Sequence, residues 1–236
     1  MRLFAISDLH LSLSSNKPMD VFSGWENYTN RIAENWQKTV RKDDTVVIAG
    51  DVSWGITLNE SLADLRFIDS LNGNKILIKG NHDYWWSTGS KIKSFFEANN
   101  IFTISILHNN CYSDGKYALC GTRGWVYDGV GEKDQKVINR ECGRLERSIE
   151  CAYHSGVKPV VFLHYPPVYG DFVCYEIISV LKKYGINKVF YGHIHGSGIH
   201  NTVAEYDGIS LKLLSADNLG FKPSLVGKCG IFTVLK

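Results

Sequence analysis

The sequence predicts an α/β fold in which strands pair in parallel early in the chain and antiparallel near its end. Short apolar runs, typical of buried strands, alternate with segments whose apolar residues recur at helical spacing. The chain has 236 residues, of which 44% are hydrophobic and 21% are charged, so it can bury a sizeable core. It shows no repeat, low-complexity tract or linker, and we expect one domain over residues 1–236.

The first hundred residues contain three expected strands, each followed by a helical pattern. Large apolar residues recur every three or four positions from Trp25 to Trp36, as on one face of a helix. The segment Thr57-Leu58-Asn59-Glu60 fits a capping box and predicts that a second helix begins there. A short third helix carries Ile92 and Phe96 on its apolar face. The strands are expected at residues 2–7, 45–49 and 75–79.

The remaining chain continues the alternation and ends in strands. Apolar spacing predicts a long amphipathic helix over residues 132–154 that stops near Gly156, and a shorter helix that stops at Gly185. Asp207-Gly208 lies between two β-rich runs and predicts a hairpin. The strands expected here are 102–107, 117–121, 159–163, 188–191, 202–206, 209–214 and 231–235.

Five of the expected strands end at residues that can bind a metal ion. The functional crevice of an α/β sheet lies at the carboxyl ends of its strands, so these residues should converge. Three of the strand ends place a glycine directly before the ligand, and glycine permits close backbone approach. Asp and Asn after a strand also cap helices and turns, so each residue alone is weak evidence. The candidates are Asp8, His10, Asp51, Asn81, His164, His193 and His195.

The order of these residues resembles the motif set of the calcineurin-like metallophosphoesterases. The resemblance implies a four-layer α/β/β/α sandwich with two mixed β-sheets and a binuclear metal centre. It also implies hydrolysis of a phosphoester by a hydroxide that bridges the two metals. The matching blocks are Asp8-Leu9-His10, Gly50-Asp51, Gly80-Asn81-His82-Asp83, His164 and Gly192-His193-Ile194-His195.

The resemblance also implies how the ligands divide between two divalent metal ions. Asp51 would bridge the ions, with one carboxylate oxygen facing each. Mixed nitrogen and oxygen ligands suit manganese, iron, zinc, nickel or cobalt and select none of them. The first ion would be held by Asp8, His10, Asp51 and His195, and the second by Asp51, Asn81, His164 and His193.

Two further residues of the third block are candidate catalytic residues. By the resemblance, His82 would lie beside the metals and either protonate the leaving oxygen or stabilise charge on the phosphoryl group. Asp83 could accept a hydrogen bond from the other ring nitrogen of His82 and fix its orientation. A histidine without a catalytic role remains the alternative for His82.

Substrate contacts are expected from residues that follow the same strands. Trp85 and Tyr165 could stack on a base, sugar or aryl leaving group, or they could pack loops against the core. Arg123 could clamp a phosphate with two hydrogen bonds, and a surface salt bridge is the alternative. Trp54 and Trp86 have the same two interpretations as the other aromatics.

The predicted activity is hydrolysis of a phosphodiester or another small phosphoester. The segment after Asp51 reads Val52-Ser53-Trp54-Gly55 and lacks the Asp-Arg pair that Ser/Thr protein phosphatases of this superfamily carry. Phosphomonoesterase activity, including protein phosphatase activity, is the alternative enzyme, and a metal-binding scaffold without turnover is a third hypothesis.

The composition of the chain limits which binding partners and which location are expected. The net charge of +2 gives no strong nucleic-acid signature and no anionic-membrane surface. No run approaches the roughly 20 apolar residues of a membrane span, and no signal peptide is recognisable. The 6 cysteines form no CxxC pair and are interpreted as thiols in a reducing compartment, so the cytoplasm is the expected location. The oligomeric state is left open.

Overall fold

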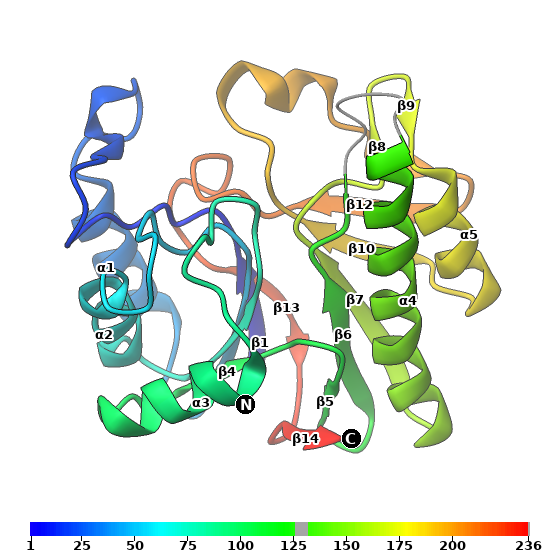
Figure 1. Ribbon diagram of the computed structural model, residues 1–236, viewed down its shortest axis with the longest axis horizontal. Helices are drawn as coiled ribbons and strands as arrows, with labels where there is room; N and C mark the ends of the chain where they lie inside the picture. Colours follow the sequence, from blue (N-terminus) through cyan, green and yellow to red (C-terminus); the bar gives the residue numbers. More distant parts are fainter. Residues whose placement is uncertain (126–131, 236) are drawn as a thin grey trace.

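Two mixed β-sheets form the centre of the molecule, which the computed structural model describes over residues 1–125 and 132–235 (Figure 1). The first sheet has the order β13-β1-β2-β3-β4. Strands β1 to β4 pair in parallel, and β13 is antiparallel to β1. The bounds are β1 (Arg2–Ile6), β2 (Thr45–Ala49), β3 (Asn74–Ile78), β4 (Ile104–Ile106) and β13 (Ser224–Lys228).

The second sheet has the order β11-β12-β10-β7-β6-β5-β14. Its central strands β12, β10, β7 and β6 are parallel, while the pairs at both edges are antiparallel. A separate two-stranded sheet contains β8 (Val168–Tyr169) and β9 (Phe172–Val173). The bounds are β5 (Cys111–Ser113), β6 (Tyr117–Thr122), β7 (Lys158–Leu163), β10 (Lys188–Tyr191), β11 (Glu205–Tyr206), β12 (Ile209–Leu213) and β14 (Thr233–Leu235).

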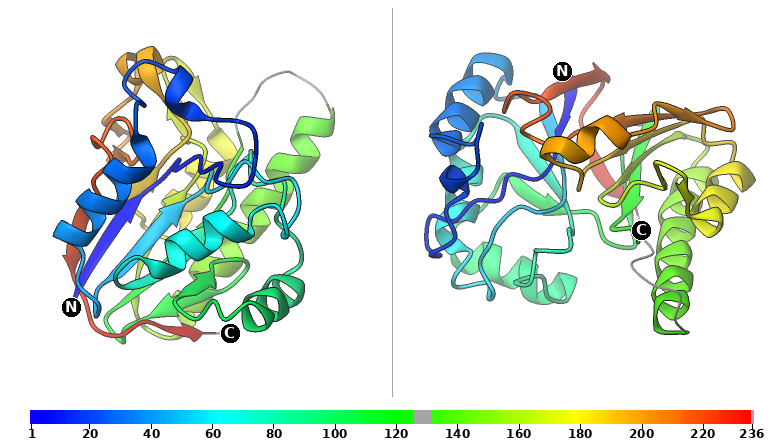
Figure 2. Two further views of the ribbon diagram at one scale, coloured as in Figure 1. Left: turned by 90° about the vertical axis from the view of Figure 1, so that its left-hand side faces the viewer. Right: turned by 90° about the horizontal axis from the view of Figure 1, so that it is seen from above.

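Helices cover the outer faces of the two sheets (Figures 1 and 2). Helices α1, α2 and α3 lie against the first sheet, and α4 and α5 lie against the second. The molecule therefore has the four layers α/β/β/α that the resemblance implied. The helices are α1 (Tyr28–Thr39), α2 (Leu62–Ser70), α3 (Gly89–Ala98), α4 (Glu132–His154) and α5 (Tyr175–Lys183), with short 3-10 helices η1 (Met19–Val21) and η2 (Gly196–Asn201).

Alternating side chains of the strands supply two different cores. In β2, Val46 and Ile48 pack under the helices of the first sheet, whereas Val47 and Ala49 face the other sheet. All five residues of β2 are buried, which explains its uninterrupted apolar run. Between the sheets, the rings of Phe162 and Phe190 stack with centroids 5.1 Å apart. This inter-sheet core fixes the relative position of the strand ends.

Most expected elements form close to their expected bounds, with differences in one helix and in four strands. The capping box forms only in part: the Glu60 N–H donates to Thr57 Oγ1 at 3.3 Å, but the Glu60 carboxylate accepts from the N–H of Ile56. Residues 58–61 make a turn, and α2 begins only at Leu62. Strands β5, β8, β9 and β13 were not expected from the sequence. The hairpin at Asp207-Gly208 is present, with positive φ values of 51° and 79° that suit its tight turn.

The end of the chain contacts both sheets. After β12, the chain adds β13 to the edge of the first sheet and then β14 to the edge of the second.

Among the helices of the described residues, none has the length and apolar character that a bilayer crossing requires.

Candidate metal centre

The candidate ligands lie together at the carboxyl ends of strands from both sheets. Asp8 and Asp51 follow β1 and β2 of the first sheet, and His164 and His193 follow β7 and β10 of the second. The backbone N–H of His193 donates to the carboxylate of Asp8, with N–O distances of 3.1 and 2.9 Å. The site is therefore built across the junction of the two sheets.

The side chains form two groups, each with one carboxylate and two imidazoles. Asp8, His10 and His195 make the first group, and Asp51, His164 and His193 make the second. Within each group, one ligand atom per residue lies within 4.8 Å of the others. His193 and His195 thus fall in different groups, as expected from the two-metal assignment.

The first group is compact. His195 Nε2 lies 3.3 Å from Asp8 Oδ1 and 3.3 Å from His10 Nε2. Asp8 is also fixed by hydroxyl donors: Ser215 donates to Oδ2 at 3.1 Å, and Ser7 makes a short hydrogen bond to the same atom. These contacts leave Asp8 Oδ1 directed toward the two imidazoles.

Asn81 joins the second group through its amide oxygen. Asn81 Oδ1 lies 2.6 Å from His164 Nε2 and 3.0 Å from His193 Nδ1. His164 Nδ1 donates to the carbonyl oxygen of Ala49 at 3.0 Å, so Nε2 of the neutral ring carries a lone pair. Two lone-pair atoms 2.6 Å apart repel each other unless a proton or a cation lies between them, so the donor set fits a metal ion.

Asp51 lies between the two groups. Its Oδ2 is 3.7 Å from His10 Nε2 and 3.5 Å from His164 Nε2. Its Oδ1 instead accepts the backbone N–H of His82 at 2.8 Å. Oδ2 is therefore the Asp51 oxygen that faces both groups, while Oδ1 holds the loop after β3.

Three glycines allow the strand ends to approach one another. A Cβ on Gly50 would lie 2.5 Å from His164 Nδ1. A Cβ on Gly80 would overlap Asp51, and one on Gly192 would overlap Ser7 and Asp8. Glycine is therefore required at these positions for the close approach predicted from the sequence.

Four of the candidate ligands have left-handed backbone conformations. Asp8, His10, Asp51 and His193 have φ values of 59°, 44°, 51° and 71°. Such conformations are uncommon for residues other than glycine and cluster at functional sites.

Burial and neighbouring charges shift the pKa values of the ligands. Burial lowers the pKa of His10 and of His164 to about 3, so both are neutral, the form that binds metals. Burial opposes the charge of His195, but Asp8 and Asp217 raise its pKa to about 10. Burial and the charges of Asp8 and Asp83 raise the pKa of Asp51. A cation entering the first group would therefore displace a proton from His195.

Asp217 orients His195 and was not among the residues predicted from the sequence. It accepts a hydrogen bond from His195 Nδ1 at 3.1 Å and another from the backbone N–H of Gly196 at 2.9 Å. A carboxylate on the distal nitrogen is the usual support of a ligating histidine. The sequence feature that could have indicated Asp217 is its position three residues after the expected strand 209–214.

The interpretation of Asp83 as the partner of His82 is wrong. The buried Asp83 carboxylate accepts hydrogen bonds from the backbone of Val52, Ser53 and Gly80 and from the indole of Trp85. In the part of the chain that the structure describes, His82 Nδ1 has no hydrogen-bond partner. Asp83 therefore ties the loops after β2 and β3 together rather than orienting the imidazole.

The three predicted substrate contacts have different outcomes. Trp85 is only 2% exposed and packs in the core, so its assignment to the substrate is wrong. Tyr165 is 7% exposed, and its ring centroid lies 4.3 Å from that of His193. The Arg123 side chain is 15% exposed, and its Nη2 lies 3.9 Å from Glu141 Oε1. Its guanidinium group lies over the Trp125 ring. Tyr165 thus adjoins a candidate ligand, while Arg123 has a protein carboxylate beside it.

Trp54 and Lys17 lie beside the first group. The Trp54 ring stacks on His10 with centroids 4.9 Å apart and lies 4.5 Å from the ring of His82. Lys17 Nζ lies 5.0 Å from the centroid of the Trp54 ring. An aromatic surface and an ammonium group therefore border the imidazoles of His10 and His82.

Comparison with known proteins gives a family model that matches most of the chain. The model of the family described as "Calcineurin-like phosphoesterase" matches residues 1–197, which include all seven candidate ligands. The "Uncharacterized protein MJ1445" of Methanocaldococcus jannaschii is 29% identical over 133 residues, covering 54% of this chain and 68% of that protein. The "Gene 66 protein" of Mycobacterium phage L5 is 45% identical over 58 residues, covering 25% of this chain and 28% of that protein.

A solved structure has a similar arrangement of elements. TT1561 of Thermus thermophilus superposes with a TM-score of 0.56 at 12% identity, covering 96% of this chain and 98% of that chain. At this level of identity, the similarity supports the α/β/β/α architecture.

Proposed function

Because the chain belongs to the calcineurin-like phosphoesterase family, we propose that it is a hydrolase that cleaves a small phosphoester at two divalent metal ions. The observation that carries the proposal is the pair of carboxylate-imidazole groups with Asp51 Oδ2 between them. The lone-pair contact between His164 and Asn81 supports the same conclusion.

The residues that would hold the ions divide as the two groups do. Asp8, His10 and His195 would hold one, His164, His193 and Asn81 the other, and Asp51 would contribute to both. Two bound cations would supply Lewis acidity to phosphoryl oxygens and lower the pKa of a water molecule at the site. Because the ligands are nitrogen and oxygen atoms, we propose manganese, iron, zinc, nickel or cobalt.

The proposed role of His82 is to contact the reacting phosphoester. Its backbone N–H is held by Asp51, and its ring lies beside Trp54, so the imidazole is fixed next to the ligand groups. From that position a ring N–H can donate to a phosphoryl or leaving-group oxygen. Trp54 would pack against the organic part of the substrate.

The preferred substrate class is a diester or another small phosphoester, and one observation favours the monoester alternative. Lys17 adds a positive charge beside Trp54 and His82. A monoester dianion interacts more strongly with an additional cation than a diester monoanion does. The relative turnover of the two classes is therefore the informative measurement.

The proposal is tested by metal analysis and a pair of substrates. Purified protein should contain close to two metal ions per chain after reconstitution with Mn²⁺. It should hydrolyse 4-nitrophenyl phosphate or bis(4-nitrophenyl) phosphate. Lys17→Gln should reduce kcat/KM for the monoester about tenfold, which corresponds to about 1.4 kcal/mol. The reduction for the diester should be smaller, because the diester carries less negative charge.

Ligand variants give the matched comparison. Asp51→Asn and His164→Ala should each lower kcat by at least about 100-fold, whereas His154→Ala on the exposed end of α4 should leave it unchanged. His193→Ala and His195→Ala should each deplete a different ion. Full activity in Asp51→Asn, or metal-loaded protein without hydrolysis of any phosphoester in a broad panel, would contradict the proposal; the latter result favours a metal-binding scaffold.

A further inference from the structure

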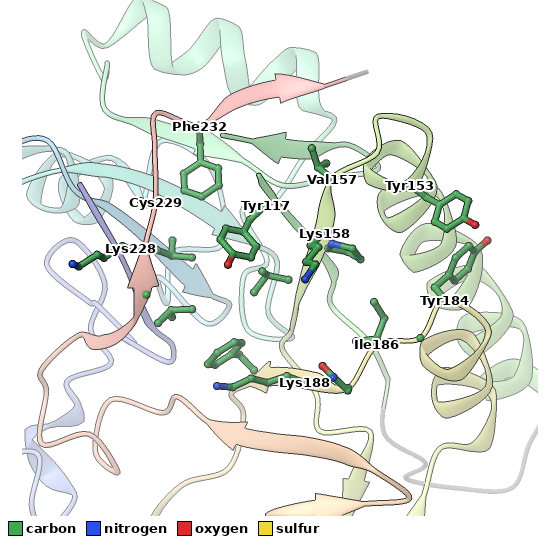
Figure 3. Close-up of a pocket in the computed structure, with 18 of the residues that line it drawn as sticks. Tyr117, Tyr153, Val157, Lys158, Tyr184, Ile186, Lys188, Lys228, Cys229 and Phe232 are labelled. Atoms are coloured by element: carbon green, nitrogen blue, oxygen red, sulfur yellow. The ribbon is translucent and has the colours of Figure 1, made fainter. Parts of the chain in front are cut away.

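A cavity of about 930 Å³ lies at the edge of the sandwich opposite the metal-ligand groups (Figure 3). It is lined by the first residues of β6, β7 and β10, namely Tyr117, Lys158 and Lys188. The other ends of β7 and β10 lead to His164 and His193. Since β7 has six residues, the cavity and the ligand groups are separated by about 20 Å at ~3.3 Å per residue.

The cavity is of a size and composition suited to a small ligand. Pockets for small ligands measure roughly 300–1,000 Å³ and combine apolar walls with a few polar groups. Leu3 and Phe190 form buried parts of the wall, and Val226 comes from β13. Apolar residues between the two sheets thus form part of the cavity wall but do not fill the cavity.

The charge of the lining is positive. Lys158, Lys188 and Lys228 all line the cavity, while no Asp or Glu among the described residues does. Within residues 1–125 and 132–235, none of these three ammonium groups has an ion pair or hydrogen bond. The C-terminal ends of α4 and α5 approach through Gly156 and Gly185, but two helix ends contribute only about −0.5 each. Three ammonium groups outweigh this contribution, so the cavity favours an anion.

Aromatic rings border the same space. Figure 3 shows Tyr117, Phe232 and Lys158 around the cavity, with Lys188 nearby. Lys188 Nζ lies 5.1 Å from the centroid of the Phe190 ring. Aromatic faces bind planar groups by stacking, and ammonium groups bind phosphate, carboxylate or sulfonate.

We propose that this cavity is a second binding site, separate from the metal centre, for a nucleotide-sized anion that contains a planar aromatic group. The aromatic group packs against Tyr117 and Phe232, and the anionic group pairs with Lys158 and Lys188. The site is independent of hydrolysis, because none of its residues adjoins the metal-ligand groups.

The first test uses the fluorescent aromatic sulfonate 8-anilinonaphthalene-1-sulfonate with the full chain. Its dissociation constant is measured for the unmodified protein and for Lys158→Gln/Lys188→Gln. The control is Lys38→Gln/Lys93→Gln, which removes two exposed lysines from α1 and α3. The cavity variant should bind the probe at least about tenfold more weakly and the control as tightly as the unmodified protein. Equal affinity in all three proteins overturns the proposal.

The second test separates the two parts of the ligand. AMP should displace the probe, whereas adenosine, which lacks the anion, and ribose 5-phosphate, which lacks the aromatic group, should each require at least about tenfold higher concentration. Displacement by adenosine as effective as by AMP overturns the proposal. Loss of the probe site upon concentration-dependent dimerisation, measured by sedimentation, also overturns it and identifies the cavity as an interface between chains. Neither test depends on hydrolysis, so failure here leaves the proposed function intact.

Discussion

Left-handed backbone at four candidate ligands indicates that the fold holds these residues against their local preference. Each such conformation costs of order 1–3 kcal/mol and persists only where the surroundings determine it. Here the surroundings include one N–H group and two hydroxyls that fix Asp8, and the N–H of His82 that fixes Asp51. The strain is thus offset by hydrogen bonds that also orient the carboxylates.

A single methyl group at Gly50 should test this arrangement. In Gly50→Ala the new Cβ would meet the imidazole of His164, and alanine would have to adopt a φ of 95°. We expect a loss of about 3 kcal/mol in the free energy of unfolding and a clear loss of metal from the second group. Urea denaturation and metal analysis of the variant provide the measurement.

Gly24→Ala is the matched control for that substitution. Gly24 has a φ of 88°, but nothing lies within 4 Å of a Cβ there. The control should lose only the backbone contribution of about 1 kcal/mol and should keep its metal. If both variants lose equal stability and equal metal, the close approach of Gly50 to His164 does not matter.

The sequence predicted which residue types gather at the site better than it predicted their partners. Strand ends identify ligands because a short apolar run terminates at each one. Partner assignments failed where neighbours in sequence point apart: Asp83 binds backbone N–H groups, although it directly follows His82. Asp217 was not predicted because three residues separate it from the end of β12. Only the turn of the folded chain brings its carboxylate to His195.

At the scale of secondary structure, long periodic elements were predictable and short paired ones were not. The 23 residues of α4 carry a sustained apolar stripe, so both bounds agreed with expectation. Strand β5 has three residues, and β13 contains a glycine and is partly exposed, so neither has a distinctive pattern. These strands form because a neighbouring strand offers free backbone groups, which the local sequence does not encode.

Asp44 links the start of β1 to the turn before β2, and its removal should weaken that junction. It accepts hydrogen bonds from the Arg2 backbone at 2.8 Å and the Arg41 backbone at 2.9 Å, and it pairs with the Arg2 guanidinium at 2.6 Å. Burial opposes ionisation, but these contacts hold the pKa of Asp44 below its usual value. Asp44→Asn should lower the free energy of unfolding by about 2 kcal/mol at pH 7.

The pH dependence of that difference follows from the lowered pKa. A carboxyl group with a folded pKa below its unfolded value of about 4 stabilises the protein above that value. The contribution disappears as the pH falls through the folded pKa. The free energies of unfolding of the unmodified protein and of Asp44→Asn should therefore become equal as the pH falls below about 4. Denaturant titrations from pH 7 to pH 3 measure this, with the adjacent exposed Asp43→Asn as control. A difference that is independent of pH would contradict the assignment.

On the scale of the whole molecule, the candidate ligands come from both sheets, so bound cations would also join the sheets. The first group combines Asp8 and His10 after β1 with His195 after β10. The second combines Asp51 after β2 with His164 and His193. Any ion that binds only the folded chain stabilises it by mass action, by about 2.7 kcal/mol per site at 100 times its dissociation constant.

Chelation should therefore lower the thermal stability of the metal-loaded protein. Two such sites give about 5 kcal/mol, and each kcal/mol shifts Tm by roughly 2–4 °C in a chain of this size, so EDTA should lower Tm by about 10–20 °C. Circular dichroism melts before and after EDTA, and after return of Mn²⁺, measure the shift. Asp51→Asn should show a smaller one. An unchanged Tm after complete removal of metal would contradict the joining of the sheets by cations.

The separation of the ligands along the chain also sets an order of events during synthesis. His10 and His195, whose ring nitrogens approach each other, are 185 residues apart in sequence. A chain emerging from the ribosome can fold the β1–β4 region long before His195 is available. The first complete set of donors therefore arises only after the second sheet has docked, so metal binding by the first group would be a late step in folding during synthesis.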